Sequence, residues 1–352
     1  MKNVLWLMQF APHYREDLLR ELGRICNLTV CCPPCSRYGL VEPSARQGYE
    51  YIELQPNSFL EKLGVVVPKG ERQVLKRPWD VVICVEDMHF PVRYFDYFLW
   101  LLSRGNRPKW LWWGHFRGRR SWKILQYARR FLVNSSSGTF TYTEKVKDEL
   151  VSWGCDASKL VSLNNSEVYR SQIAPRVLPT LEGRLRLLFV GRPEPEKRIE
   201  RVIELVERLD VLDARLIGPT MSRYSDMVRE KNLADRIDLC EAKTGNALEE
   251  DFEWCHVVVN PGTLGLLVIN AARYGRAVIV DRDSRHGPEI VVAEETGQFI
   301  IDWSDQQELD AFFLGLLERE DQLRERGQQL SAYVQSNYTI EKMVERFAIH
   351  CT

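Results

Sequence analysis

Residues 185–206 read LRLLFVGRPEPEKRIERVIELV, and this stretch decides the fold class. It opens with an almost continuous apolar run that ends at Gly191. Apolar side chains then recur along one helix face, at Ile199, Val202 and Val206. A short apolar run bounded by a turn residue predicts a buried strand, and the helical period predicts a helix packed against it.

The same alternation of short apolar runs and helical periodicity continues through the chain. In the first half, runs of this kind lie at Asn3–Gln9, Asn27–Cys32, Val81–Val85, Trp110–Trp113 and Thr139–Tyr142. The second half adds Ala214–Ile217, Ile237–Cys240, His256–Asn260 and Ala277–Val280, before a helical C-terminus. Strands that alternate with helices indicate βαβ units and parallel sheets, so we predict an α/β protein.

Chain length and one irregular segment indicate two domains. The chain has 352 residues, which exceeds one typical domain. Residues 171–183, SQIAPRVLPTLEG, carry two prolines and a glycine without a clear period, as a linker does. We predict doubly wound, Rossmann-like domains at residues 1–175 and 176–335. Residues 336–352 are expected to form a helix that packs back on the first domain.

Bulk composition is that of an ordinary globular protein of the cytoplasm. Apolar residues make up 45% of the chain and charged residues 28%, which is enough for two cores. The nine cysteines are odd in number and irregularly spaced, which favours ordinary thiols in a reducing compartment. The N-terminal apolar run breaks at Ala11-Pro12-His13, and no uncharged run of 18 apolar residues exists. We therefore expect neither a signal peptide nor a membrane span.

Two turns after predicted strands are candidates for binding a phosphate group. In the first, Gly191 and Arg192 follow an apolar strand, and Lys197 stands at the expected start of a helix. An arginine can bind two oxygens at once, a lysine adds a compact charge, and a helix start adds its dipole. The alternative is that both cations are solvated surface residues.

The second turn, NPGTLGLLVINAA at residues 260–272, also follows a strand and precedes a helix. Its glycines, Gly262 and Gly265, would let an anion approach backbone N–H groups closely. A tight turn that only packs against the sheet is the alternative. Asp281-Arg282-Asp283 has the acid-x-acid spacing of some metal sites, but it follows a buried strand late in the chain. We expect it to be a solvated loop.

These motifs resemble those of the GT4 family of glycosyltransferases. FVGRPEPEK (189–197) is similar to the family's Gly-Arg turn and following Glu-Lys. NPGTLGLLVINAARYGRAVIV (260–280) and HGPEIVVAEETGQFI (286–300) resemble its glycine turn, its next helix and strand, and its Glu-Ile-Val segment. In the first half, Trp113-Gly114-His115 and the segment Lys159–Asn165 match more loosely.

The resemblance implies a GT-B fold, in which two Rossmann-like domains face each other across a cleft and the second binds a nucleotide-sugar donor. It implies a retaining transferase of the hexosyltransferase type that uses no metal and no cofactor besides the donor, which is UDP- or GDP-linked. His115, Arg192 and Lys197 would be catalytic, with His115 reaching the donor sugar from the first domain. The residues expected to bind the donor are Gly191, Arg192, Lys197, Gly262, Thr263, Leu264, Gly265, Leu266 and Asn270.

Two departures from the family pattern leave alternatives open. Family members usually have glutamates at the positions of Gly262 and Asn270. Asn270 can still hydrogen-bond a ribose, whereas Gly262 offers only backbone. A nucleotide-sugar epimerase of the same fold and a non-catalytic GT-B module are therefore the alternatives. A nicotinamide dehydrogenase is disfavoured, because no G-x-G-x-x-G follows the first strand.

The charge distribution raises the question of a membrane. Residues 1–180 carry a net charge of +9 and residues 181–352 carry −10. Residues 91–130 hold ten Lys and Arg, one acid and five tryptophans, and include a helix expected to open at Arg119-Arg120-Ser121 with Trp122. A basic aromatic surface would bind an anionic membrane, whereas the alternative is that the aromatics form core. We expect a glycan or lipid-linked acceptor and, without a recognition motif, no nucleic acid.

Overall fold

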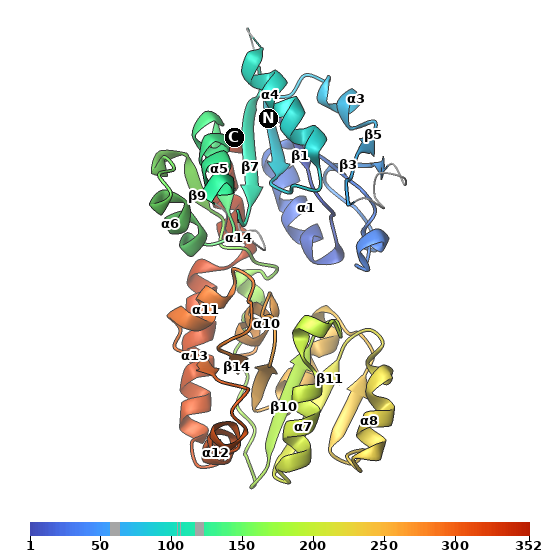
Figure 1. The fold of residues 1–352 in the computed structure, drawn as a ribbon, viewed down its shortest axis with the longest axis vertical. Coiled ribbons are helices and arrows are strands. Elements are labelled where there is room, and N and C mark those ends of the chain that lie inside the picture. Colours follow the sequence, from blue (N-terminus) through green and yellow to red (C-terminus); the bar gives the residue numbers. More distant parts are fainter. Residues whose placement is uncertain (57–63, 104, 106, 117–122) are drawn as a thin grey trace. The chain divides into compact units, whose positions relative to one another are not determined.

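The computed structural model divides the chain into two compact units. It describes residues 1–56, 64–103, 105, 107–116 and 123–352. The first unit comprises residues 1–167 and 340–352, and the second comprises residues 168–339. Each unit is a parallel sheet covered by helices, so the predicted pair of Rossmann-like α/β domains is confirmed (Figure 1).

The first unit contains a seven-stranded parallel sheet in the order β3-β2-β1-β6-β7-β8-β9. Its strands are β1 (Asn3–Leu7), β2 (Asn27–Cys32), β3 (Glu50–Glu53), β6 (Val81–Val85), β7 (Lys109–Gly114), β8 (Gly138–Thr141) and β9 (Leu160–Ser162). Its helices are α1 (Glu16–Ile25), α3 (Glu71–Leu75), α4 (Pro91–Leu102), α5 (Lys123–Ser135), α6 (Glu144–Ser152) and α14 (Ile340–Cys351). Two short antiparallel strands, β4 (Gln55–Pro56) and β5 (Pro68–Lys69), lie apart from the sheet.

The second unit contains a six-stranded parallel sheet in the order β12-β11-β10-β13-β14-β15. Its strands are β10 (Leu185–Val190), β11 (Leu212–Ile217), β12 (Ile237–Cys240), β13 (Val257–Asn260), β14 (Ala277–Asp281) and β15 (Phe299–Ile301). Its helices are α7 (Glu200–Arg208), α8 (Ser225–Glu230), α9 (Glu249–Trp254), α10 (Leu267–Arg273), α11 (Ile290–Glu295), α12 (Gln306–Leu316) and α13 (Glu320–Asn337). None of the helices in the described ranges has the length and hydropathy needed to cross a bilayer.

The segment predicted as a linker, residues 171–183, packs within the second unit. The backbone N–H of Ala174 donates to the carbonyl of Arg273 (2.9 Å), and that of Arg176 donates to the carbonyl of Tyr274 (3.0 Å). These tertiary bonds satisfy a backbone that has no regular structure of its own. The first boundary therefore falls after residue 167 instead of after residue 175.

The C-terminal helix α14 belongs to the first unit because aromatic side chains hold it there. The Phe347 ring lies 5.0 Å from the Trp6 ring and 4.6 Å from the Phe140 ring, measured between centroids. All three side chains are fully buried. Aromatic contacts of this size add to the stabilisation from burial alone. Helix α14 therefore packs into the core of the first unit, although the other residues of that unit lie far away in sequence.

Three of the tryptophans considered for a membrane surface are core residues instead. Trp110, Trp112 and Trp113 on β7 are each at most 3% exposed. A central parallel strand is covered on both faces, so all its side chains are buried regardless of alternation. The expected helix opening at residues 119–122 lies outside the described residues, and α5 is described from Lys123.

Candidate functional site

Topology places the candidate site at one edge of the second sheet. Strand β10 pairs with β11 on one side and with β13 on the other, so the strand order reverses there. Ligands of open α/β sheets bind beyond the carboxyl ends of the strands at such a reversal. The loops that leave this edge from β10 and β13 carry all the donor-binding residues predicted in this unit except Asn270.

Lys197 joins the loop after β10 to the loop after β13. Its Nζ donates to the carbonyl of Thr263 (2.5 Å), and the Thr263 N–H donates in return to the carbonyl of Glu196 (2.8 Å). Burial lowers the pKa of Lys197, while the nearby carboxylate of Glu194 opposes that shift. An ammonium has three donors, and the described residues account for one of them. The remaining donors are available to an anion.

Arg192 lies close enough to Lys197 to act on it electrostatically. Its positive charge is one of the influences that lower the pKa of Lys197, as like charges do. The Arg192 side chain is 44% exposed, and its Nη1 lies 3.0 Å from Oε1 of Glu194. The two predicted phosphate-binding cations therefore lie on the same loop, and each is within range of the other's positive charge. An incoming phosphate would relieve their mutual repulsion.

The predicted helix start at Lys197 was wrong. Residues Pro195–Lys197 form a 3-10 turn that ends at Arg198, whose φ of 52° lies in the left-handed region. Helix α7 begins only at Glu200. A left-handed residue breaks a right-handed helix, so the dipole of α7 does not begin at the lysine. Lys197 contributes its own charge at this position.

Gly262 is required by the backbone that packs against it. A Cβ at this position would lie 2.1 Å from the carbonyl oxygen of Glu196 and 2.6 Å from the carbonyl carbon of Lys197. Both are backbone atoms, which cannot move aside as a side chain can. The absence of a glutamate at 262 is therefore built into the close contact of the two loops. The same contact brings Lys197 against Thr263.

The rest of the glycine turn supplies backbone donors. Within the described part of the chain, the N–H groups of Gly265 and Leu266 have no hydrogen-bond acceptor. A Cβ at Gly265 would meet no atom within 4 Å, so open space adjoins the turn. Asn270 is half-buried on α10, where its N–H donates to the carbonyl of Leu266 (3.2 Å). Unpaired N–H groups beside open space suit an anionic ligand.

His286, which the motifs did not single out, holds the glycine turn in place. Its Nδ1 accepts the N–H of Leu264 (3.1 Å), and its Nε2 donates to the carbonyl of Asp281 (2.6 Å). This pair of bonds requires the neutral ring, and burial lowers the pKa of His286 accordingly. The Gly287 N–H also donates to the Leu264 carbonyl (2.9 Å). No spacing rule in the sequence indicates such a role.

The sequence predicted that Asp281 lies in a solvated loop, and for this residue the prediction was wrong. Its side chain is 1% exposed and forms an ion pair with Arg198 (2.9 Å), while the Ser284 hydroxyl donates to it (2.7 Å). Asp283, two residues later, is exposed. The described residues contain no group of His, Cys, Asp and Glu side chains arranged to hold a metal ion. Asp281 instead anchors the loop that carries His286.

His115, the predicted catalytic residue of the first unit, directly follows β7. Its exposed ring stacks on the Tyr142 ring, with centroids 4.1 Å apart, and Tyr142 stacks in turn on the buried Trp113 (5.1 Å). The stack fixes the imidazole at the carboxyl edge of the first sheet. That His115 reaches the donor sugar stays a prediction.

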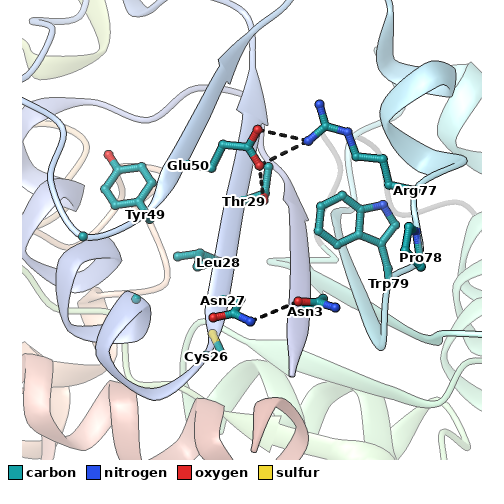
Figure 2. A pocket seen from close by; sticks show the side chains of 12 residues that line it. Asn3, Cys26, Asn27, Leu28, Thr29, Tyr49, Glu50, Arg77, Pro78 and Trp79 are labelled. Carbon is teal, nitrogen blue, oxygen red and sulfur yellow. Dashed lines mark hydrogen bonds and ion pairs between the residues drawn. The ribbon is translucent and has the colours of Figure 1, made fainter. Parts of the chain in front are cut away.

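A pocket of about 550 Å³ lies at the opposite edge of the first sheet, where β1, β2 and β3 begin. Figure 2 shows Glu50 of β3 between Thr29 and Arg77, which donate to it at 2.8 Å and 3.0 Å. These two bonds lower the pKa of Glu50. The charges that line this pocket satisfy each other. It also lies away from the carboxyl edge at which parallel sheets bind ligands.

Comparisons with known proteins find similar chains for both units. Residues 171–333 match the model of the family described as glycosyl transferases group 1. Among solved structures, HepE of Anabaena in complex with UDP-glucose is 13% identical, with a TM-score of 0.69 and 99% of both chains covered. Sucrose-phosphate synthase of Thermosynechococcus elongatus is 15% identical, with a TM-score of 0.69 and coverage of 99% of this chain and 98% of its own.

A third solved structure is similar to the same extent. The apo form of the lipopolysaccharide outer core galactosyltransferase WaaB is 14% identical, with a TM-score of 0.68 and 99% of both chains covered. At these identities the likeness shows the fold, which is GT-B. No curated protein matches the chain by sequence.

Proposed function

We propose that this chain, whose residues 171–333 match the family described as glycosyl transferases group 1, moves a sugar from a nucleotide-diphosphate donor to a glycan or glycolipid acceptor. The observation that carries the proposal is the loop pair of the second unit. There the Nζ of Lys197 donates one hydrogen bond to the Thr263 carbonyl, its other N–H donors remain available, and Arg192 lies nearby. Two cations and unpaired backbone N–H groups can bind a pyrophosphate.

The reaction we propose is a GT4-like hexosyl transfer that retains the configuration at the anomeric carbon and uses no metal ion. The bond between that carbon and the diphosphate oxygen breaks, and an acceptor hydroxyl attacks the same face. The leaving phosphate takes the hydroxyl proton. Arg192 and Lys197 would stabilise the charge that develops on the diphosphate, as a divalent ion does in other enzymes. We propose UDP or GDP as the nucleotide, and HepE, which binds UDP-glucose, makes UDP the first probe.

We also propose an acceptor and a setting, and the charge of the first half of the chain supports them. We propose that the enzyme works in the cytoplasm, in peripheral contact with the inner face of the membrane, on acceptors for cell-surface polysaccharide or glycoconjugate synthesis. The net charge of +9 on residues 1–180 supports attraction to anionic lipid.

The test of the donor site is calorimetric titration of UDP and GDP into the wild type and Lys197→Ala. Loss of a charge-assisted hydrogen bond costs about 1.5 to 3 kcal/mol, which is roughly a tenfold to hundredfold loss of affinity. Lys231→Ala is the matched control, because Lys231 pairs with Glu207 before β12 begins. Wild-type affinity in Lys197→Ala, or an equal loss in Lys231→Ala, would count against the site.

A non-catalytic nucleotide-sugar module is the second candidate, and Gly262 favours it. The close backbone contact excludes any side chain from this position, where the family usually has a glutamate. Incubation with donor sugars, with and without a glycan acceptor, separates the functions by their products. Acceptor-dependent product supports the transferase. A rearranged sugar without acceptor indicates an epimerase, and binding without turnover indicates the module.

A further inference from the structure

Helix α4 of the first unit exposes only apolar side chains. Its exposed residues are Pro91, Phe95, Phe98, Leu99 and Leu102. The last four have the i, i+3, i+4, i+7 spacing of one helix face. Leu102 is 78% exposed and Phe95 is 53% exposed. A surface helix normally turns polar residues to water, so this outward apolar face requires an explanation.

Helix α5 continues the same surface. The Phe131 ring stacks on the Phe98 ring with centroids 6.2 Å apart and planes 18° apart, although both rings are about half exposed. Ile124 is 71% exposed and Tyr127 is 68% exposed, and they share the helical spacing of Phe131. We call the surface of Phe95, Phe98, Leu99 and Leu102 on α4 with Ile124, Tyr127 and Phe131 on α5 the α4–α5 face.

The exposed charges on helices α4 and α5 themselves are of one sign. On the described residues of both helices, the exposed charged side chains are Lys123 and Arg130, and no carboxylate is exposed. Asp96 is only partly exposed and pairs with Arg72 (3.0 Å), whose guanidinium lies over the Phe95 ring (5.1 Å). A surface that is apolar at its centre and cationic at its edge complements an apolar layer beneath anionic groups.

A second copy of the chain fits this surface less well than a lipid bilayer does. Two copies that paired through the α4–α5 face would bring Lys123 and Arg130 of both molecules to the same interface. Like charges placed opposite each other disfavour such pairing. A bilayer with anionic head groups places phosphates where these cations lie and takes up aromatic and aliphatic side chains below them.

We propose that the α4–α5 face is the surface by which the protein docks on an anionic lipid bilayer. The aromatic and aliphatic side chains enter the interfacial layer, while Lys123 and Arg130 bind head-group phosphates. The proposed contact is peripheral, through the outward side chains of two surface helices. This inference deepens the membrane contact in the proposed function and rests on it, but its residues are separate from the donor site.

The experiment is flotation of the full-length protein with vesicles of phosphatidylcholine, with and without phosphatidylglycerol. We expect binding to the mixed vesicles that salt weakens. Leu102→Ser and Ile124→Ser should each weaken it about tenfold, since each removes an exposed side chain that lipid would bury. Lys123→Ala should weaken it about fivefold, and only on vesicles that contain phosphatidylglycerol.

The matched control is Ile349→Ser on α14, because Ile349 is 61% exposed in the same unit but outside the α4–α5 face. An equal loss in this control overturns the proposal. So does equal binding to both vesicle types, or a protein dimer without lipid that Leu102→Ser dissociates. UDP titration of the same variants should match the wild type. Failure of docking and failure of the donor site are then distinct results.

Discussion

Helices α7 and α4 both cover a parallel sheet, yet they turn opposite kinds of residue to solvent. On α7, Val202 and Val206 are buried and the exposed positions are Glu204 and Glu207. On α4, every exposed side chain is apolar. The inward face of a helix is fixed by the sheet it covers, whereas the outward face is free to serve another purpose. The outward face therefore carries the information about partners.

The carboxyl edges of the two sheets differ in the same way. The second unit gathers cations and backbone N–H groups at this edge, around Lys197 and Gly265. The first unit carries the ring stack of His115, Tyr142 and Trp113. Cations and N–H groups suit a phosphate, and the exposed ring of His115 suits a sugar or an apolar acceptor. Variants at each edge should therefore affect different steps.

The largest effect is expected from Gly262→Ala in the second unit. The added Cβ would collide with the carbonyl of Glu196, so the two loops must separate and Lys197 must leave Thr263. We expect UDP affinity to fall about a hundredfold and stability to fall by about 1 to 3 kcal/mol. Calorimetry and denaturant unfolding measure the two losses.

Gly265→Ala is the control for stability, because a Cβ there meets no atom within 4 Å. Its free energy of unfolding should lie within about 0.5 kcal/mol of that of the wild type. If Gly262→Ala kept both wild-type stability and wild-type affinity, the close contact between the loops would not be what forms the donor site.

A smaller effect is expected from His115→Ala in the first unit. If the imidazole hydrogen-bonds the donor sugar in the reaction, its loss should lower turnover by roughly tenfold to a hundredfold. The affinity for UDP alone should stay unchanged, because UDP lacks the transferred sugar. Steady-state rates and UDP titrations of the same preparation provide the comparison. Equal losses in both would place His115 at the nucleotide instead.

Much of this arrangement could be predicted from the sequence because it depends on local pattern. The apolar run before Gly191 and the helix period after it predict a strand and a helix whatever surrounds them. The two candidate phosphate-binding turns were predicted in the same way. Since both follow strands of one parallel sheet, their meeting at its carboxyl edge could also be expected.

The remaining features depend on contacts between residues far apart in sequence. A glycine is required at 262 because the backbone of Glu196 packs against it. His286 holds its loop through hydrogen bonds with Leu264 and Asp281. No single-sequence pattern records such pairs. The tryptophans of β7 show the same limit, since composition could not separate a buried aromatic from an exposed one. The exposed aromatics Phe98 and Phe131 became visible only once helix orientation was known.

The smallest effect concerns pH and distinguishes His286 from the rest of the second unit. A proton on its Nδ1 would face the N–H of Leu264 and break that bond. Because burial lowers the folded pKa of His286, its stabilising contribution is complete above the unfolded value of about 6.5 and declines as pH falls below it. His256 acts in the same direction over a wider range, because its folded pKa is lowered to about 4.

Titration of UDP at about pH 7.5 and about pH 5.5 separates these two histidines. Protonation of His286 should weaken UDP binding about threefold by loosening the glycine turn, whereas His256 lies where β13 begins, away from the loops proposed to bind the nucleotide. His286→Asn keeps an acceptor for the Leu264 N–H but cannot titrate, so its UDP affinity should depend less on pH than that of the wild type. Protonation of UDP itself affects both proteins equally and cancels in the comparison. If His286→Asn retained the full pH dependence of UDP affinity, a titrating group other than His286 would hold the glycine turn. The carboxyl edge of the second unit would then not differ from that of the first through this histidine.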